Sequence, residues 1–97
     1  MQPVQVTQRG GPAVLKMMPL PDSVPGEGQV VVKVEAIGVN YVDILARRGT
    51  YPRAPSPPFV PGIEVAGTVS RVGPKVSGAQ GGDRIVGLAA GGGGYAE

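Results

Sequence analysis

The sequence predicts one mainly β domain, an all-β barrel or sandwich that carries a single short helix. Apolar and polar residues alternate in several short runs, which is typical of half-buried strands. The seventeen glycines and eleven prolines mainly separate these runs, so they indicate turns between strands rather than low complexity. In one stretch the apolar period changes from two residues to the helical period, and this stretch gives the helix.

The chain opens with two runs that predict a β-hairpin. In Pro3–Gln8, Val4 and Val6 alternate with polar residues, and Val14–Leu20 is a second apolar run. The intervening Arg9–Pro12 contains two glycines and a proline, which are residues typical of turns. We therefore expect two short antiparallel strands at the start of the domain.

A longer strand and the helix follow. Residues 29–37 alternate over nine positions, as a half-buried strand does. From Asn40 the pattern suits a helix over about residues 40–48, with Asn40 as its N-cap, Asp43 in its first turn and Gly49 just past its end. So short a helix must be stabilised by packing against the rest of the domain.

The second half of the chain contains a loop and two more strands. Five prolines within residues 52–61 exclude a helix or a central strand there and predict a stiff loop. Alternation resumes at Ile63, and Gly67 is expected at a bulge or a close backbone approach. Residues 84–88 predict a short strand, and the glycine run 91–94 predicts a flexible connection between strands rather than a phosphate-binding loop.

Composition argues against several classes of function. The net charge is +2 at pH 7, and the nine basic residues are scattered, so we expect no nucleic-acid interface. No apolar run approaches the roughly 20 residues of a membrane helix, so we expect no membrane association and a cytoplasmic protein. Since the sequence contains no histidine and no cysteine, a zinc site of the usual ligands and a Ser-His or Cys-His nucleophile are excluded.

Five segments resemble one enzyme family in the same order along the chain. They are GGP at 10–12, GVNYVD at 38–43, GTYP at 49–52, PGIEVAG at 61–67 and GDR at 82–84. Together they are similar to the zinc-independent, zeta-crystallin-like quinone oxidoreductases of the medium-chain dehydrogenase/reductase superfamily. The resemblance covers only the N-terminal domain of that family. It implies that residues 1–97 form a GroES-like, partly open β-barrel, incomplete at its C-terminal end, and that the Rossmann domain is absent from this chain.

The resemblance implies an NADPH-dependent quinone or enone oxidoreductase that transfers hydride without zinc. Zinc-dependent relatives carry Cys and His in the segments where this chain has Asn40 and Ile63, so we expect no metal. The Rossmann domain would bind most of the NADPH, and the isolated chain is therefore expected to have little or no activity. The resemblance leaves the oligomeric state open, with a homodimer as one assembly of the full-length enzyme.

The same resemblance implies the roles of four residues. Asn40 would be the catalytic residue beside the nicotinamide, and Tyr51 would contact the cofactor from the same cleft. Tyr41 and Phe59 are weaker candidates for the quinone pocket. Each has a structural alternative, since Asn40 suits a helix N-cap and each aromatic suits packing on the barrel. Glu64 is expected to form a buried pair with an arginine rather than to act as a catalytic acid.

Two hypotheses from other classes stay open. The chain could be a non-catalytic GroES-like binding or assembly module, either a remnant of such an enzyme or a chaperonin-like ring subunit, because a fold does not fix a function. It could also be one half of a split enzyme that assembles with a separate Rossmann polypeptide. A stable ring in a native mass measurement would favour the chaperonin-like alternative, and a monomer or dimer would not.

Overall fold

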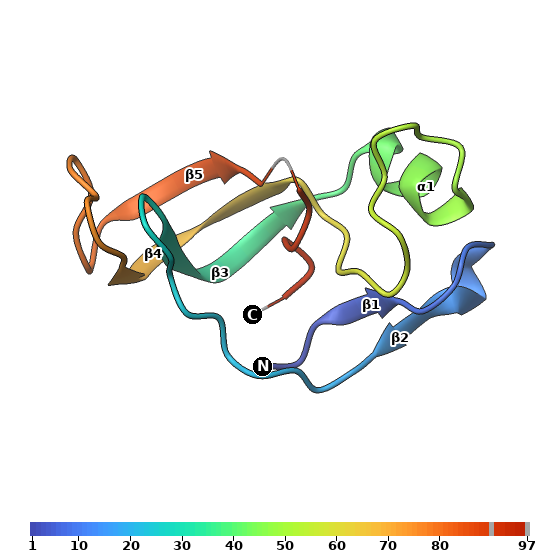
Figure 1. Cartoon of the computed structure of the whole chain (residues 1–97), viewed down its shortest axis with the longest axis horizontal. Helices are drawn as coiled ribbons and strands as arrows, with labels where there is room; N and C mark the ends of the chain where they lie inside the picture. Colours follow the sequence, from blue (N-terminus) through green and yellow to red (C-terminus); the bar gives the residue numbers. More distant parts are fainter. Residues whose placement is uncertain (90, 97) are drawn as a thin grey trace.

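The computed structural model describes residues 1–89 and 91–96, which form two antiparallel sheets and a short α-helix (Figure 1). In chain order the elements are β1 (Val4–Val6), the 3-10 helix η1 (Pro12–Val14), β2 (Leu15–Met17), β3 (Val30–Gly38), α1 (Tyr41–Arg48), β4 (Glu64–Val72) and β5 (Arg84–Leu88). Strands β1 and β2 form one sheet, and β3, β4 and β5 form the other in that order. The prediction of a mainly β domain with one short helix is confirmed, and the sheets leave the barrel open.

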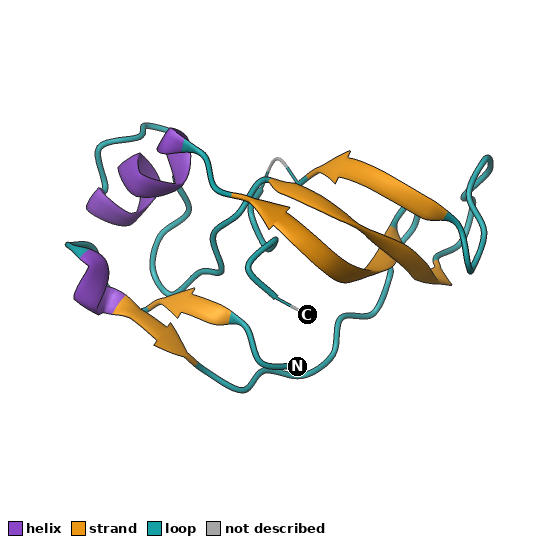
Figure 2. Ribbon diagram, turned by 180° about the vertical axis from the view of Figure 1, so that it is seen from behind, coloured by secondary structure: helices purple, strands orange, loops and turns teal. Residues whose placement is uncertain are grey.

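The opening hairpin is tied to the far half of the chain. Within it Val4 pairs with Met17 and Val6 with Leu15. The backbone of Val6 also exchanges two hydrogen bonds with Phe59, of 2.8 and 3.2 Å. The turn of the hairpin is joined to α1, since Gly10 N–H donates to the carbonyl of Arg47 at 3.0 Å. As a result, η1 and α1 lie at the same end of the molecule (Figure 2).

The small core lies where the hairpin, α1 and the proline-rich loop meet. Its buried cluster consists of Val6, Val14, Ala46 and Phe59, one or two residues from each of these parts. Val69 of β4 is also buried, at 1% exposure. Burial of these apolar side chains is the main favourable contribution to folding. It also holds α1, which is too short to be stable on its own.

The pairing of β3 with β4 explains the glycine inside β4. Val34 pairs with Gly67 and Ala36 pairs with Ala66, so β3 has one extra residue at this point and forms a bulge. A side chain at position 67 would clash with the carbonyl oxygen of Lys33. The prediction of a bulge and of a close backbone approach at Gly67 is therefore confirmed.

The glycine run after β5 differs from the sequence-based expectation. The sequence predicts a flexible connection at residues 91–94, but this run pairs with the end of the proline-rich loop. Gly93 N–H donates to the carbonyl of Val60 at 2.7 Å, and Gly94 N–H donates to that of Gly62 at 2.9 Å. Gly94 is buried. Glycine suits this place because a side chain at position 94 would lie 2.9 Å from the Gly62 oxygen.

Candidate functional site

The candidate site is built on the junction between β3 and α1. Asn40 has extended backbone angles, φ −118° and ψ 154°, and is the N-cap of the helix. Asn40 and Asp43 have the arrangement of a capping box, but the Asn40 side chain makes no cap hydrogen bond, and Asp43 N–H donates to the Asn40 backbone carbonyl at 3.0 Å. The bond from Asn40 N–H to Asp43 Oδ2 is 2.9 Å. Gly49 ends the helix in the left-handed conformation, at φ 78°. Both helix boundaries predicted from the sequence are confirmed.

The side-chain amide of Asn40 is also held from β4. Its Nδ2 donates to Glu64 Oε2 at 3.1 Å. Because an ionised carboxylate can only accept, the amide nitrogen rather than the amide oxygen must face Glu64. Glu64 is exposed, and no arginine forms an ion pair with it in the part of the chain that the structure describes. The expectation of a buried pair with an arginine is therefore wrong, since the start of β4 faces the β3–α1 junction.

Asp43 has a buried carboxylate that accepts hydrogen bonds from two donors. It is 6% exposed. Besides the N–H of Asn40, its Oδ2 accepts a hydrogen bond of 2.9 Å from the Tyr95 hydroxyl. Burial of a carboxylate is costly unless donors compensate it, so these two bonds explain how Asp43 can lie here. They also fix the first turn of α1 to the segment that follows the glycine run.

Burial and Asp43 together raise the pKa of Tyr95 to about 12, with burial the larger cause. The folded chain therefore holds the phenol proton more tightly than the unfolded chain. This contribution to stability is fully present below the ordinary tyrosine pKa of about 10 and is lost as the pH rises through 12.

We therefore expect the free energy of unfolding to fall between about pH 10 and about pH 12, and the Y95F variant to lose this dependence. Urea unfolding across the range measures it. Y41F is the matched control, since Tyr41 is 67% exposed, and it should keep the wild-type profile. An identical alkaline fall in Y95F would contradict the assignment.

Tyr51 lies in the loop after α1 and is half-buried. It lines a cavity of about 40 Å³ together with Val42 and Asp43 of the first turn, and with Phe59. Asn40 does not line this cavity. The volume is far below the roughly 300 Å³ at which ligand pockets begin. The described residues therefore do not bring Asn40 and Tyr51 into one pocket, because the amide turns toward β4 while the tyrosine packs beside α1. That both residues face a bound cofactor stays a prediction.

The two remaining candidates have opposite environments. Phe59 is 9% exposed and belongs to the core cluster, where its backbone is paired with Val6. It also lines the small cavity. Tyr41, the first residue of α1, is 67% exposed and does not line this small cavity. The structure therefore does not bring Tyr41 and Phe59 together.

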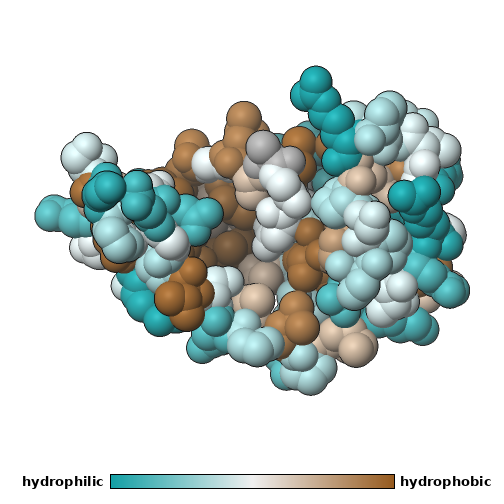
Figure 3. All heavy atoms as spheres, viewed as in Figure 1, coloured by the Kyte–Doolittle hydropathy of each residue, from teal (hydrophilic) through white to brown (hydrophobic). Residues whose placement is uncertain are grey.

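The described residues also form a larger cleft, which the sequence does not predict. It has a volume of about 810 Å³ and is lined by residues 30–34 of β3 together with Val65, Leu88, Met1 and residues 92–94. We refer to it as the sheet cleft. Figure 3 shows apolar side chains gathered around a hollow on this face. None of the four candidate residues lines it. The only signal in the sequence was the continuous run of valines in β3, which also suits an ordinary buried strand.

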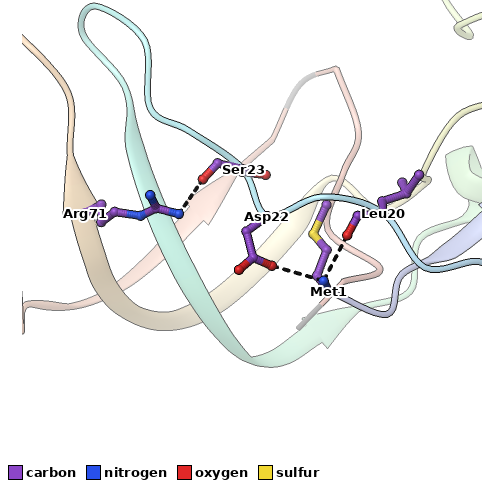
Figure 4. Close-up of polar contacts among 5 residues, drawn as sticks. All are labelled: Met1, Leu20, Asp22, Ser23 and Arg71. Carbon is purple, nitrogen blue, oxygen red and sulfur yellow. Dashed lines mark hydrogen bonds and ion pairs between the residues drawn. The ribbon is translucent and has the colours of Figure 1, made fainter.

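Polar contacts close one rim of the sheet cleft (Figure 4). The amino-terminal ammonium group of Met1 donates to Asp22 at 3.0 Å and to the carbonyl of Leu20 at 2.9 Å. The hydrogen bond from this group, followed by its charge, lowers the pKa of Asp22. Arg71 donates to the carbonyl of Ser23 at 2.8 Å. Through these contacts, the loop that precedes β3 is bound both to β4 and to the first residue of the chain.

The described residues contain no cluster of three His, Cys, Asp or Glu side chains that could hold a metal ion. Within the same ranges, residues 1–89 and 91–96, no helix has the length and apolar character needed to cross a bilayer. The β3–α1 junction holds the amide of Asn40, the carboxylates of Asp43 and Glu64 and the phenol of Tyr95.

Comparison with known proteins places this junction in a family. Residues 26–97 match the alcohol dehydrogenase GroES-like domain. The whole chain is 45% identical to the quinone oxidoreductase of Lama guanicoe and 43% identical to that of Homo sapiens, and it spans about 30% of the length of each. A crystal structure of Escherichia coli quinone oxidoreductase complexed with NADPH superposes with a TM-score of 0.87 at 38% identity, over 95% of this chain and 28% of that one.

These matches agree with the open two-sheet architecture and with the order of the motifs along the chain. The shared part is the N-terminal part of the relatives, which are oxidoreductases. The chain therefore belongs to the alcohol dehydrogenase GroES-like domain family, with quinone oxidoreductases of the medium-chain dehydrogenase/reductase superfamily among its relatives.

Proposed function

We propose that this chain supplies the N-terminal part of the catalytic domain of an NADPH-dependent quinone or enone oxidoreductase. Quinone oxidoreductases match it over its whole length, and one solved relative is a complex with NADPH. The observation that carries the proposal is that the Asn40 side chain is fixed in orientation and still accessible. The Asp43 carboxylate holds its backbone and the Glu64 carboxylate holds its amide, yet Asn40 remains half-exposed at the start of α1.

NADPH would supply the hydride, and the chain would position the cofactor and the acceptor relative to each other. Asn40 fits this task because its amide keeps one N–H donor after its bond to Glu64. That donor can orient a carbonyl group of the cofactor or of the acceptor. Tyr51, half-buried in the loop after α1, offers a ring and a hydroxyl to the cofactor. Accurate positioning alone contributes much of the rate in such a transfer.

The proposal includes a reaction without zinc. The sequence has no histidine and no cysteine, so the usual nitrogen and sulfur ligands of zinc are missing from this chain. A quinone or enone is already electron-poor and needs no metal to polarise it. The proposal also includes a small-molecule acceptor rather than a nucleic acid or a membrane, a cytoplasmic location and a homodimer of the full-length enzyme.

The test is NADPH oxidation by the complete gene product that contains this chain, with a quinone as acceptor. We expect turnover that survives treatment with a metal chelator. The isolated chain should show no turnover and no tight NADPH binding, because it corresponds to only 30% of its relatives. Absence of NADPH-dependent quinone reduction by the complete gene product would refute the proposal. Micromolar NADPH affinity of the isolated chain would refute its division of labour.

A further inference from the structure

We propose that Glu64 is a positioning residue that fixes the orientation of the Asn40 side-chain amide. Its Oε2 accepts a hydrogen bond of 3.1 Å from Asn40 Nδ2, across 24 residues of sequence. Glu64 is the first residue of β4, and the described residues offer its carboxylate no ion pair. The Glu64 carboxylate can therefore accept from the Asn40 amide without competition from an ion pair. The position of Glu64 at the start of β4 places it beside the β3–α1 junction.

A glycine opposite Glu64 makes room for this bond. Gly38, the last residue of β3, is the register partner of Glu64. A Cβ atom added at Gly38 would lie 2.5 Å from Glu64 Oε2 and 2.7 Å from its Cδ. The Gly38 backbone is not in the left-handed region, so an alanine there would be tolerated by the main chain. It would displace the flexible carboxylate instead.

The bond to Glu64 limits what the Asn40 amide can offer a ligand. The Asp43 carboxylate holds the Asn40 backbone N–H, and Glu64 takes one of the two N–H donors of Nδ2. One N–H donor remains, so Asn40 can recognise an acceptor such as a carbonyl oxygen. This second step rests on the proposed function, because it assigns that donor to a carbonyl of the acceptor or of the nicotinamide.

The first test needs no enzyme activity. In the isolated chain, the side-chain amide signals of Asn40 are identified by NMR from their disappearance in N40D. We expect both E64M and G38A to move these signals toward the values of a solvated amide. E64Q, whose amide oxygen can accept the same bond, should keep them close to wild type.

The sheet supplies matched controls for both changes. Glu35 is an exposed glutamate whose carboxylate accepts from Thr68 Oγ1 at 3.0 Å instead. Gly87 is a strand glycine at which a Cβ would meet only Ile85 Cδ1, at 3.8 Å. E35M and G87A should therefore leave the Asn40 signals unchanged. Unchanged signals in both E64M and G38A would overturn the proposal, as would equal changes in the controls.

The second test uses the complete gene product. We expect E64M and G38A each to lower kcat/KM for quinone reduction by about tenfold, the loss of one positioned hydrogen bond, with E64Q within about twofold of wild type. Wild-type activity in E64M would overturn the catalytic part of the proposal. An inactive wild-type product would refute the proposed function instead, and the NMR result would still decide whether Glu64 orients Asn40.

Discussion

Replacing Asn40 by serine in the complete gene product is expected to lower kcat/KM for quinone reduction by about 100-fold, as removal of one aligned donor does in other active sites. Serine is an effective N-cap, so α1 should keep its start while the amide donor is lost. Steady-state kinetics of N40S against wild type measure the change.

The alanine variant separates catalysis from capping. N40A removes the cap as well as the amide, so we expect the same loss of kcat/KM and, in addition, about 1 kcal/mol less stability in urea unfolding. N40S should stay within about 0.5 kcal/mol of wild type, since serine restores the cap. An N40S enzyme with wild-type kcat/KM would show that Asn40 acts only as a helix cap.

Replacing Phe59 by alanine is expected to cost about 3–5 kcal/mol of unfolding free energy, because it leaves a cavity in the core. The side chain is 9% exposed and packs with Val6, Val14 and Ala46. Urea unfolding of the isolated chain, followed by circular dichroism, measures the loss. If F59A does not fold, F59L, which keeps most of the apolar volume, should fold with a loss of about 1 kcal/mol.

Tyr41 supplies the comparison for the core assignment. Because it is 67% exposed, Y41A should change the stability by no more than about 0.5 kcal/mol. Equal losses in F59A and Y41A would contradict the assignment of Phe59 to the core. A small loss in F59A together with a large rise in the KM for quinone would instead support a role for Phe59 in the quinone pocket.

The features that the sequence predicted well are those that depend on near neighbours. Helix α1 is bounded by Asn40 and Gly49, and both boundaries follow from preferences that act within one turn. The bulge at Gly67 was visible for a similar reason, since a glycine inside an alternating strand is unusual. Local patterns therefore defined the elements of this fold and most of their limits.

The features that the sequence missed depend on residues far apart in the chain. The hydrogen bond between Tyr95 and Asp43 spans 52 residues, and that between Asn40 and Glu64 spans 24. Periodicity shows which face a residue occupies, but not which residue lies opposite. For this reason the sequence predicts an arginine partner for Glu64, whereas the glycine at its register position, Gly38, leaves room for a contact with the Asn40 amide.

The sheet cleft was missed for a different reason. Its walls are the aliphatic side chains of β3 with Val65 and Leu88, which look in sequence like parts of a closed core. Whether such residues are covered depends on how the sheets close, and here they form an open arrangement. The same openness explains why only a few apolar residues of the described chain are fully buried.

The central claim is that the β3–α1 junction presents Asn40 to a bound nicotinamide and its acceptor. The most direct measurement is a crystal structure of the complete gene product with NADPH. We predict the Asn40 amide within hydrogen-bonding distance of the nicotinamide or of the acceptor site, with its Nδ2 still bonded to Glu64. A nicotinamide bound away from this junction, with Asn40 contacting only the protein, would contradict the claim.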